Sequence, residues 1–523
     1  MHPKNVYRNG ISFTQLAKEH PSFAKCLKGG SSINFHDPES VRQLAKALLK
    51  KDFNLEIELP EDRLCPAYAD IQADTLHDRL NYILWVADLL TDTHESKAPS
   101  TPSPEAPRIT GIDIGTGASA IYPLLGCASY PHWHFIATEN DATSLSHASK
   151  NVANNLLERR IKIVDASSSS SILPTADIAA SATPLDFTMC NPPFYASVND
   201  MLASAKLKAV PPLSACTGST TEMVTDGGEV AFVSRMVDES IALQGKVRWY
   251  TSMLGKLSSV EKVIDKLKEC GIVNYVVGEF VQGVGKTKRW AVGWSFGERR
   301  AGDHISRQPT THSLKSHLPF PTTFRIQLPA DAALSTFLPQ VEALVKDSCT
   351  DFPAENFNWN SIRLPCFATM YGAVENLYSN GCGETTGNTW SRAARRRRKK
   401  ATTEGVDVEA AEVEPKFGFA VGIFIGAGGR GSPPSSSMKV KTSSADEAKD
   451  NEKGKETEKE TAVENDAWDH DFISLPASSV EIESSKGSYV LVRRTRGVDQ
   501  VVWESFCGML RRKIVEGLPK LKT

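Results

Sequence analysis

The feature that most constrains the fold is an alternation of short apolar runs with helical stretches between residues 109 and 296. Successive parallel strands need a crossover connection, usually a helix, so this alternation predicts a largely parallel sheet covered by helices. The expected strands are 109–114, 134–138, 161–164, 185–190, 246–253, 275–280 and 290–296. Two stretches interrupt the pattern, a Ser/Ala-rich connection (166–182) and a polar segment (199–222), which we expect to be functional or irregular loops.

Composition narrows the class of protein. Of the 523 residues, 40% are hydrophobic and 23% are charged, which excludes a wholly disordered chain. The 10 cysteines include no CxxC pair and no zinc-like spacing with histidine, so we expect a reducing compartment and no metal. The chain lacks a signal-peptide pattern at residues 1–5 and any apolar run near the ~20 residues that span a bilayer, so no membrane partner is expected.

Shifts in composition predict four parts. These are a helical extension (1–96), an α/β domain (97–300), a small α+β domain in two pieces (317–390 and 480–523), and between them a basic cluster with a disordered insertion (391–479). We expect helices at 37–50, 79–90, 332–346, 366–377 and 499–514, and further strands at 322–328 and 488–493. A Gly-rich apolar run, 417–425, has no assignment.

A glycine-rich turn follows the first expected strand. Gly115 and Gly117 would let the backbone approach a ligand at the carboxyl end of the sheet. A dinucleotide fingerprint has a third glycine where this chain has Ala120. Asp113, in contrast, suits the amino group of S-adenosylmethionine. A nicotinamide oxidoreductase is therefore disfavoured, although such turns also occur as purely structural connections.

Acidic residues follow the next two strands. Glu139 is placed to accept hydrogen bonds from a ribose diol, which indicates a nucleoside-containing cofactor without saying which. A solvated acid at the end of a strand is the competing interpretation. Asp165 is a weaker candidate for contact with the adenine end of that cofactor.

The most specific signal is Asn191-Pro192-Pro193-Phe194, directly after a strand. An exocyclic amine is unreactive because its lone pair is delocalised into the ring. The carbonyls of Asn191 and Pro192 can accept its two N–H bonds, while the prolines restrict φ and carry no N–H. Phe194 can stack on the base, a contact worth about 1–3 kcal/mol. The motif therefore predicts amine methylation by positioning, with adenine, cytosine or glutamine amides as substrates.

Longer segments carry a resemblance to the methyltransferase-like protein 16 family of U6 small nuclear RNA adenine methyltransferases. The likeness covers about residues 1–296 and rests on residues 34–39, 80–83, 113–126, 191–194, 248–250, 253–256 and 289–291. Bacterial ribosomal RNA adenine methyltransferases share this core but generally lack the C-terminal extension.

The resemblance implies a class I, Rossmann-like methyltransferase that uses S-adenosylmethionine to form N6-methyladenosine in structured RNA. It further implies a nuclear location and a role in pre-mRNA splicing. The positions that match donor-binding residues are Arg79, Gly115, Ser119, Glu139 and Asn191. Lys4, Tyr7 and Arg8 match a basic arm that lies along RNA, and the split C-terminal domain matches an RNA-binding domain.

The sequence departs from the family at three places. Val6 replaces a basic residue of the arm, Ser-rich residues 167–171 replace a regulatory loop, and 283–286 is lengthened.

Several cations are candidates for RNA contacts. Arg395, Arg396 and Arg397 belong to the basic cluster 392–400, which would neutralise phosphates or serve as a nuclear localisation signal. Arg248 and Arg289 would contact RNA or take part in structural ion pairs. A ribosomal RNA or glutamine-amide methyltransferase and an RNA-binding splicing regulator are the alternatives. The sequence does not indicate the oligomeric state.

Overall fold

The computed structural model describes residues 2–65, 76–94, 107–206, 219–281, 288–309, 311–328, 334–349, 357–360, 367–368, 374–385, 417–425, 489–497 and 499–518. None of the helices in these ranges is long and apolar enough to cross a membrane.

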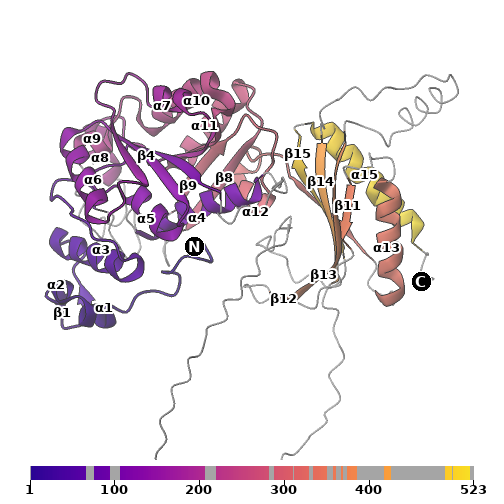
Figure 1. The fold of residues 1–523 in the computed structure, drawn as a ribbon, viewed down its shortest axis with the longest axis horizontal. Coiled ribbons are helices and arrows are strands. Elements are labelled where there is room, and N and C mark those ends of the chain that lie inside the picture. Colours follow the sequence, from indigo (N-terminus) through magenta and orange to yellow (C-terminus); the bar gives the residue numbers. More distant parts are fainter. Residues whose placement is uncertain are drawn as a thin grey trace, which may run out of the picture.

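A seven-stranded sheet forms the centre of the larger part of the molecule (Figure 1). Its strands are β3 (Ile109–Ile114), β4 (Trp133–Glu139), β5 (Ile161–Asp165), β6 (Leu185–Cys190), β7 (Val247–Leu254), β8 (Tyr275–Val281) and β9 (Lys288–Trp294). Their order is β5-β4-β3-β6-β7-β9-β8. All neighbours from β5 to β7 are parallel, whereas β9 is antiparallel to both β7 and β8. This order confirms the predicted class I fold, and each predicted strand overlaps an observed one.

Helices cover both faces of this sheet. The helices are α4 (Leu76–Asp92), α5 (Ile121–Ser129), α6 (Ala142–Asn154), α7 (Thr175–Ala180), α10 (Gly228–Leu243) and α11 (Leu257–Glu269). One apolar cluster unites residues of α4, α5 and α6 with the sheet, and a second cluster unites residues of α7, α10 and α11 with it. Because β6 is covered on both faces, all of its residues are buried.

The N-terminal residues share the core of the α/β domain. Here α1 (Phe13–Glu19), α2 (Pro21–Ala24), the hairpin of β1 (Leu27–Lys28) and β2 (Ser32–Ile33), and α3 (Pro38–Phe53) precede α4. The apolar cluster that contains Phe23 and Leu44 continues through Trp85 to Phe135 and Trp249. The described residues of the predicted helical extension (1–96) therefore pack against the sheet through one continuous apolar core. The polar segment 199–222 is also more regular than expected, since it contains α8 (Val198–Lys206) and begins α9 (Thr220–Met223).

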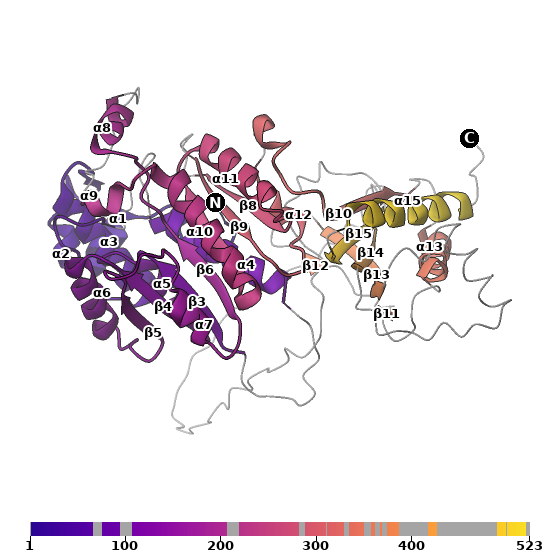
Figure 2. The ribbon, with the colours of Figure 1, turned by 90° about the horizontal axis from the view of Figure 1, so that it is seen from above.

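A second sheet is built from the C-terminal part of the chain (Figures 1 and 2). It contains β10 (Thr323–Gln327), β15 (Tyr489–Arg496), β14 (Phe417–Ile425), β13 (Val374–Thr385) and β11 (Phe357–Asn360) in that order, and β12 (Phe367–Ala368) pairs with β13. The helices α13 (Leu334–Cys349) and α15 (Gln500–Gly517) contribute to its apolar core. A short helix, α12 (Asp303–Ser306), lies between the two sheets in the sequence.

Two features of this sheet differ from the sequence analysis. The run 417–425, which lies inside the predicted insertion and had no assignment of its own, is strand β14 and pairs with both β13 and β15. Within the range 366–377, where a helix was predicted, the described residues are strands: Phe367–Ala368 form β12, and Val374 begins β13.

Buried polar contacts join the C-terminal sheet to the α/β domain. The guanidinium of Arg493 in β15 bonds to the carboxylate of Asp92 at the end of α4, and both side chains are nearly inaccessible, at 2% and 6% exposure. Arg300 donates its backbone N–H to Thr495 O and its Nε to Gly497 O, each at 3.0 Å. Burial, together with the nearby positive charge of Arg494, lowers the pKa of Arg300 to about 9.

Candidate active site

A cavity of about 310 Å³ opens at the carboxyl ends of β3, β4 and β6. The chain continues from β3 to β4 and β5 on one side of the sheet and then crosses to β6 on the other side of β3. This edge is therefore the topological switch point where open α/β sheets bind ligands. The cavity brings together most of the residues predicted for the donor site. These are Arg79, Gly115, Gly117, Ser119, Glu139 and Asn191.

The glycine turn presents backbone to this cavity. Gly115 and Gly117 have φ angles of +68° and +65°, a left-handed conformation that other residues rarely adopt. The turn is held to the neighbouring strand, because Gly117 N donates to Glu139 Oε2 at 2.8 Å and Thr116 N donates to Thr138 O at 2.9 Å. These bonds fix the path of the backbone beside the ligand space.

Glu139 is a buried and firmly oriented carboxylate. It accepts backbone N–H bonds from Gly117, Asn140 and Asp141 at 2.8–2.9 Å. Burial raises its pKa, although these three bonds oppose the shift. Its position at the end of β4 fits a ribose diol. Asp165 behaves differently, since it is exposed, bonds to Ser167 N at 2.8 Å and is not among the described residues that line the cavity.

Asp113 lies beneath the cavity wall and does not line it. It is fully buried, and neither carboxylate oxygen has a hydrogen-bond partner among the described residues. Burial raises its pKa to about 7, against the opposing effects of Thr116 and Arg79. Arg79 itself reaches the cavity from α4, with its guanidinium 5.5 Å from the ring centroid of Tyr122. A buried carboxylate without a partner next to a cavity fits a ligand that carries positive charge.

The Asn-Pro-Pro-Phe turn begins where β6 ends. Asn191 and Pro193 line the cavity, whereas Pro192 is buried. Phe194 is half-buried, with the Arg289 guanidinium 5.7 Å from its ring centroid. On another side of the ring is Gly255, where an added Cβ would stand 3.0 Å from Phe194 Cδ1. The predicted amide, proline and aromatic groups therefore gather at this edge of the sheet.

Hydrogen bonds from neighbouring segments also hold the Asn-Pro-Pro-Phe turn in place. Tyr195 N donates to Met223 O at 3.1 Å, and Thr225 N donates to Tyr195 O at 3.0 Å. Glu229 of α10 accepts N–H bonds from Gly255 at 2.7 Å and Lys256 at 3.2 Å. These contacts limit movement of the segment that carries Phe194.

The residues predicted to contact RNA have different surroundings. Lys4 and Arg8 are exposed, and Lys4 Nζ lies 3.5 Å from Asp88. Tyr7 is only 2% exposed and packs edge-on against His77, so its side chain belongs to the core, and its contact with RNA stays a prediction.

The remaining cations are separated from one another. Arg248 stands at the amino end of β7, 3.6 Å from Asp186, and so at the opposite edge of the sheet from the cavity. Its position favours the ion-pair interpretation. Arg289, at the start of the antiparallel strand β9, has its guanidinium close to the ring of Phe194. Arg395, Arg396 and Arg397 lie outside the described residues.

Several residues that line the cavity were not predicted from the sequence. They are Leu64, Glu222, Phe232 and Arg235, with the serines of 169–171. Arg235 donates to Ser170 O at 2.9 Å, and Glu239 accepts the N–H groups of Ile172 and Leu173 at 3.0 and 2.8 Å. The only local pattern among these residues is the Ser-x-x-Glu spacing of Ser219 and Glu222. That spacing is typical of a helix N-terminus and does not indicate a ligand.

The described residues contain no group of three or more His, Cys, Asp or Glu side chains that could hold an ion.

A sheet of this order, with the amide of Asn191 and the ring of Pro193 lining a glycine-lined cavity at its switch point, defines a class I methyltransferase. A family model described as RNA methyltransferase matches residues 1–298. The chain belongs to this RNA methyltransferase family.

Two relatives show how far the similarity extends. The U6 small nuclear RNA (adenine-(43)-N(6))-methyltransferase of Schizosaccharomyces pombe is 37% identical over 379 residues, which is 72% of this chain and 86% of that protein. The RNA N(6)-adenosine-methyltransferase METTL16 of Homo sapiens is 41% identical over 303 residues, or 57% of this chain and 50% of that protein. The chain therefore spans most of the yeast relative and half of the human one.

A solved structure is similar over the same region. The human METTL16 catalytic domain in complex with MAT2A 3'UTR hairpin 1 is 38% identical, with a TM-score of 0.48, and the match covers 57% of this chain and 95% of that one.

Proposed function

We propose that this protein transfers a methyl group from S-adenosylmethionine to the N6 atom of an adenosine in structured RNA, with U6 small nuclear RNA as the leading substrate. The observation that carries the proposal is the position of Asn191, which lines the glycine-lined cavity at the carboxyl end of β6. The names of the yeast and human relatives support the choice of adenosine N6.

The residues at this edge would bind and orient both reactants. S-adenosylmethionine supplies an electrophilic methyl group, whose bond to sulfur breaks as the N6–carbon bond forms and one N6 proton is released. Glu139 and the glycine turn would hold the nucleoside part of the donor. Asn191 Oδ1 and the Pro192 carbonyl would accept the two N6–H bonds, and Phe194 would stack on the base.

Positioning supplies the rate enhancement in this mechanism. Fixing two reactants in alignment removes entropy costs that a bimolecular reaction must meet, and no strong base is required. An unpaired adenosine in a loop or bulge is the favoured target, because its extrusion avoids the cost of opening a base pair.

A direct assay tests the proposal. Purified full-length protein is incubated with labelled S-adenosylmethionine and a U6-like hairpin, and the digested RNA is analysed for N6-methyladenosine. Asn191→Ala should abolish product at an unchanged melting temperature. Asn199→Ala, which changes an exposed amide on α8, should leave the activity intact. Full activity of the Asn191 variant would refute the assigned mechanism.

The same assay distinguishes the alternatives. Label in ribosomal RNA or in a protein glutamine would indicate the ribosomal or amide methyltransferase. Tight binding of RNA without any methyl transfer would indicate an RNA-binding regulator. A nuclear location and a role in splicing remain part of the proposal, and imaging of the tagged full-length chain tests the location.

A further inference from the structure

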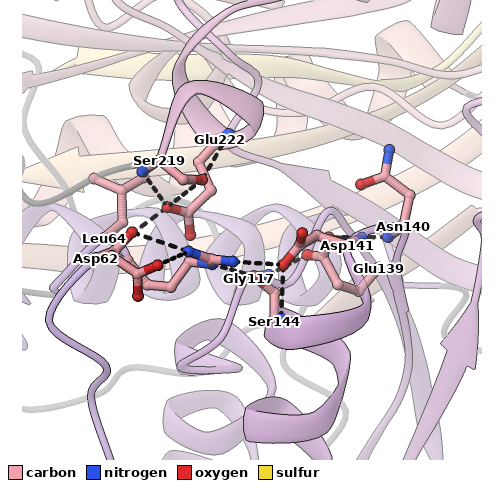
Figure 3. A network of polar contacts seen from close by, with 10 residues as sticks. Asp62, Leu64, Gly117, Glu139, Asn140, Asp141, Ser144, Ser219 and Glu222 are labelled. Carbon is pink, nitrogen blue, oxygen red and sulfur yellow. Dashed lines mark hydrogen bonds and ion pairs between the residues drawn. The ribbon is translucent and has the colours of Figure 1, made fainter.

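Glu222 has one carboxylate oxygen in structural use and one facing the donor cavity. Oε2 accepts hydrogen bonds from Leu64 N at 3.0 Å, Ser219 N at 2.9 Å and Ser219 Oγ at 3.2 Å (Figure 3). Glu222 N in turn donates to Ser219 Oγ at 3.3 Å, which completes a capping box at the start of α9. These contacts account for Oε2 and leave Oε1 unexplained.

The second oxygen points across the cavity toward the glycine turn. Oε1 lies 3.6 Å from the position that a Cβ on Gly117 would occupy, and no described residue forms a hydrogen bond with it. Gly117 N also donates to Glu139 Oε2, so the carboxylates of Glu222 and Glu139 both lie close to this glycine (Figure 3). The space between them belongs to the cavity that both residues line.

The position of Glu222 is set by elements far apart in the sequence. Arg63, next to Leu64, bonds to Asp141 Oδ2 at 3.0 Å and to Ser144 Oγ at 3.2 Å at the start of α6. The backbone N–H of Leu64 is thereby held where Oε2 meets it. A carboxylate fixed in this way would not need to reorganise when a charged ligand binds.

The donor and the product of the proposed reaction differ in charge. S-adenosylmethionine has a sulfonium, whereas S-adenosylhomocysteine has a neutral thioether and is otherwise the same. Arg79 and Arg235 also line the cavity and suit the carboxylate that both molecules share. A negative charge near the glycine turn would therefore stabilise bound S-adenosylmethionine more than bound S-adenosylhomocysteine.

From this arrangement, and resting on the proposed function, we infer that Glu222 selects the cationic donor over the neutral product. It lowers the free energy of the bound sulfonium form through its cavity-facing Oε1, and so favours binding of the donor when donor and product compete for the cavity.

Glu222→Gln tests this role without removing the capping box. The amide oxygen can still accept from Leu64 N and Ser219 N, while the negative charge is lost. Dissociation constants for S-adenosylmethionine and S-adenosylhomocysteine are measured by calorimetry on the full chain. We expect S-adenosylmethionine affinity to fall about fivefold or more relative to that for S-adenosylhomocysteine, as loss of one charge pair near the surface implies. Asp226→Asn removes the same charge from an exposed position four residues away and should leave the ratio unchanged.

The outcomes separate this inference from the proposed function. A ratio that stays at the wild-type value in Glu222→Gln, or equal loss of both affinities, would overturn the selectivity role. Wild-type protein that binds neither molecule would instead refute the proposed function. An unchanged melting temperature shows that the variant is folded.

Discussion

The buried ion pair between Arg493 and Asp92 should control whether the C-terminal sheet stays docked on the α/β domain. Arg493→Met leaves the Asp92 carboxylate buried at 6% exposure with Gly302 N as a remaining donor at 2.7 Å. Breaking such a pair on one side costs about 3–5 kcal/mol. Because Asp92 keeps the Gly302 bond, we expect the lower end, about 3 kcal/mol.

Amide hydrogen exchange on the full chain measures this cost locally. A loss of about 3 kcal/mol corresponds to roughly 100-fold faster exchange for amides that open together with β15. Strand β6, in the middle of the other sheet, provides an internal reference that should exchange at the wild-type rate.

A double-mutant cycle identifies the cause. Asp92→Asn keeps an acceptor for Gly302 N, and combining it with Arg493→Met removes both charges. The double variant should then lose about 2 kcal/mol less than the sum of the single variants. Additive effects would show that the pair does not stabilise the docked arrangement, and the reasoning from burial would be wrong.

Two other perturbations follow from the site. Gly255→Ala places a Cβ 3.0 Å from the Phe194 ring, so the methylation rate should fall about tenfold while S-adenosylhomocysteine binding is retained. The control is Gly245→Ala, whose added Cβ meets no atom within 4 Å and should leave the rate unchanged. Asp113 has a pKa of about 7 in the folded chain against 3.8 as its ordinary value, so the folded state binds the extra proton. The free energy of unfolding without donor should therefore fall as pH rises from about 5 to about 7, and Asp113→Asn should flatten that dependence in thermal melts. An equal slope in the variant would exclude Asp113 as the source.

The central sheet could be predicted because its strands carry strong local signals. Strands such as β3 and β6 are compact apolar runs followed directly by glycine or proline turns, and their ends also mark the site. Asn191 and Glu139 were found for this reason, since parallel strands bring their carboxyl ends to one edge.

The failures have a common physical cause in long-range contacts. Strand β14 pairs with β15, which lies more than 60 residues later in the chain, and nothing local in a Gly-rich apolar run indicates that partner. Tyr7 was placed on an RNA-binding arm by the family resemblance, whereas its ring lies in the core beside His77. Glu222 is fixed by Leu64, which is remote in the sequence, so its place at the cavity becomes visible only in the fold.

Among the first 92 residues, those that the structure describes therefore belong to the packed core that shapes the donor cavity. Arg79 supplies one wall of the cavity, and Leu64 anchors Glu222 at another. Tyr82, also from α4, hydrogen-bonds Thr251 Oγ1 at 2.6 Å and receives the N–H of Cys190, the residue directly before Asn191. An RNA that shifts the N-terminal segment would consequently change both the affinity for the donor and the position of the Asn-Pro-Pro-Phe turn, because the same packed core supports both.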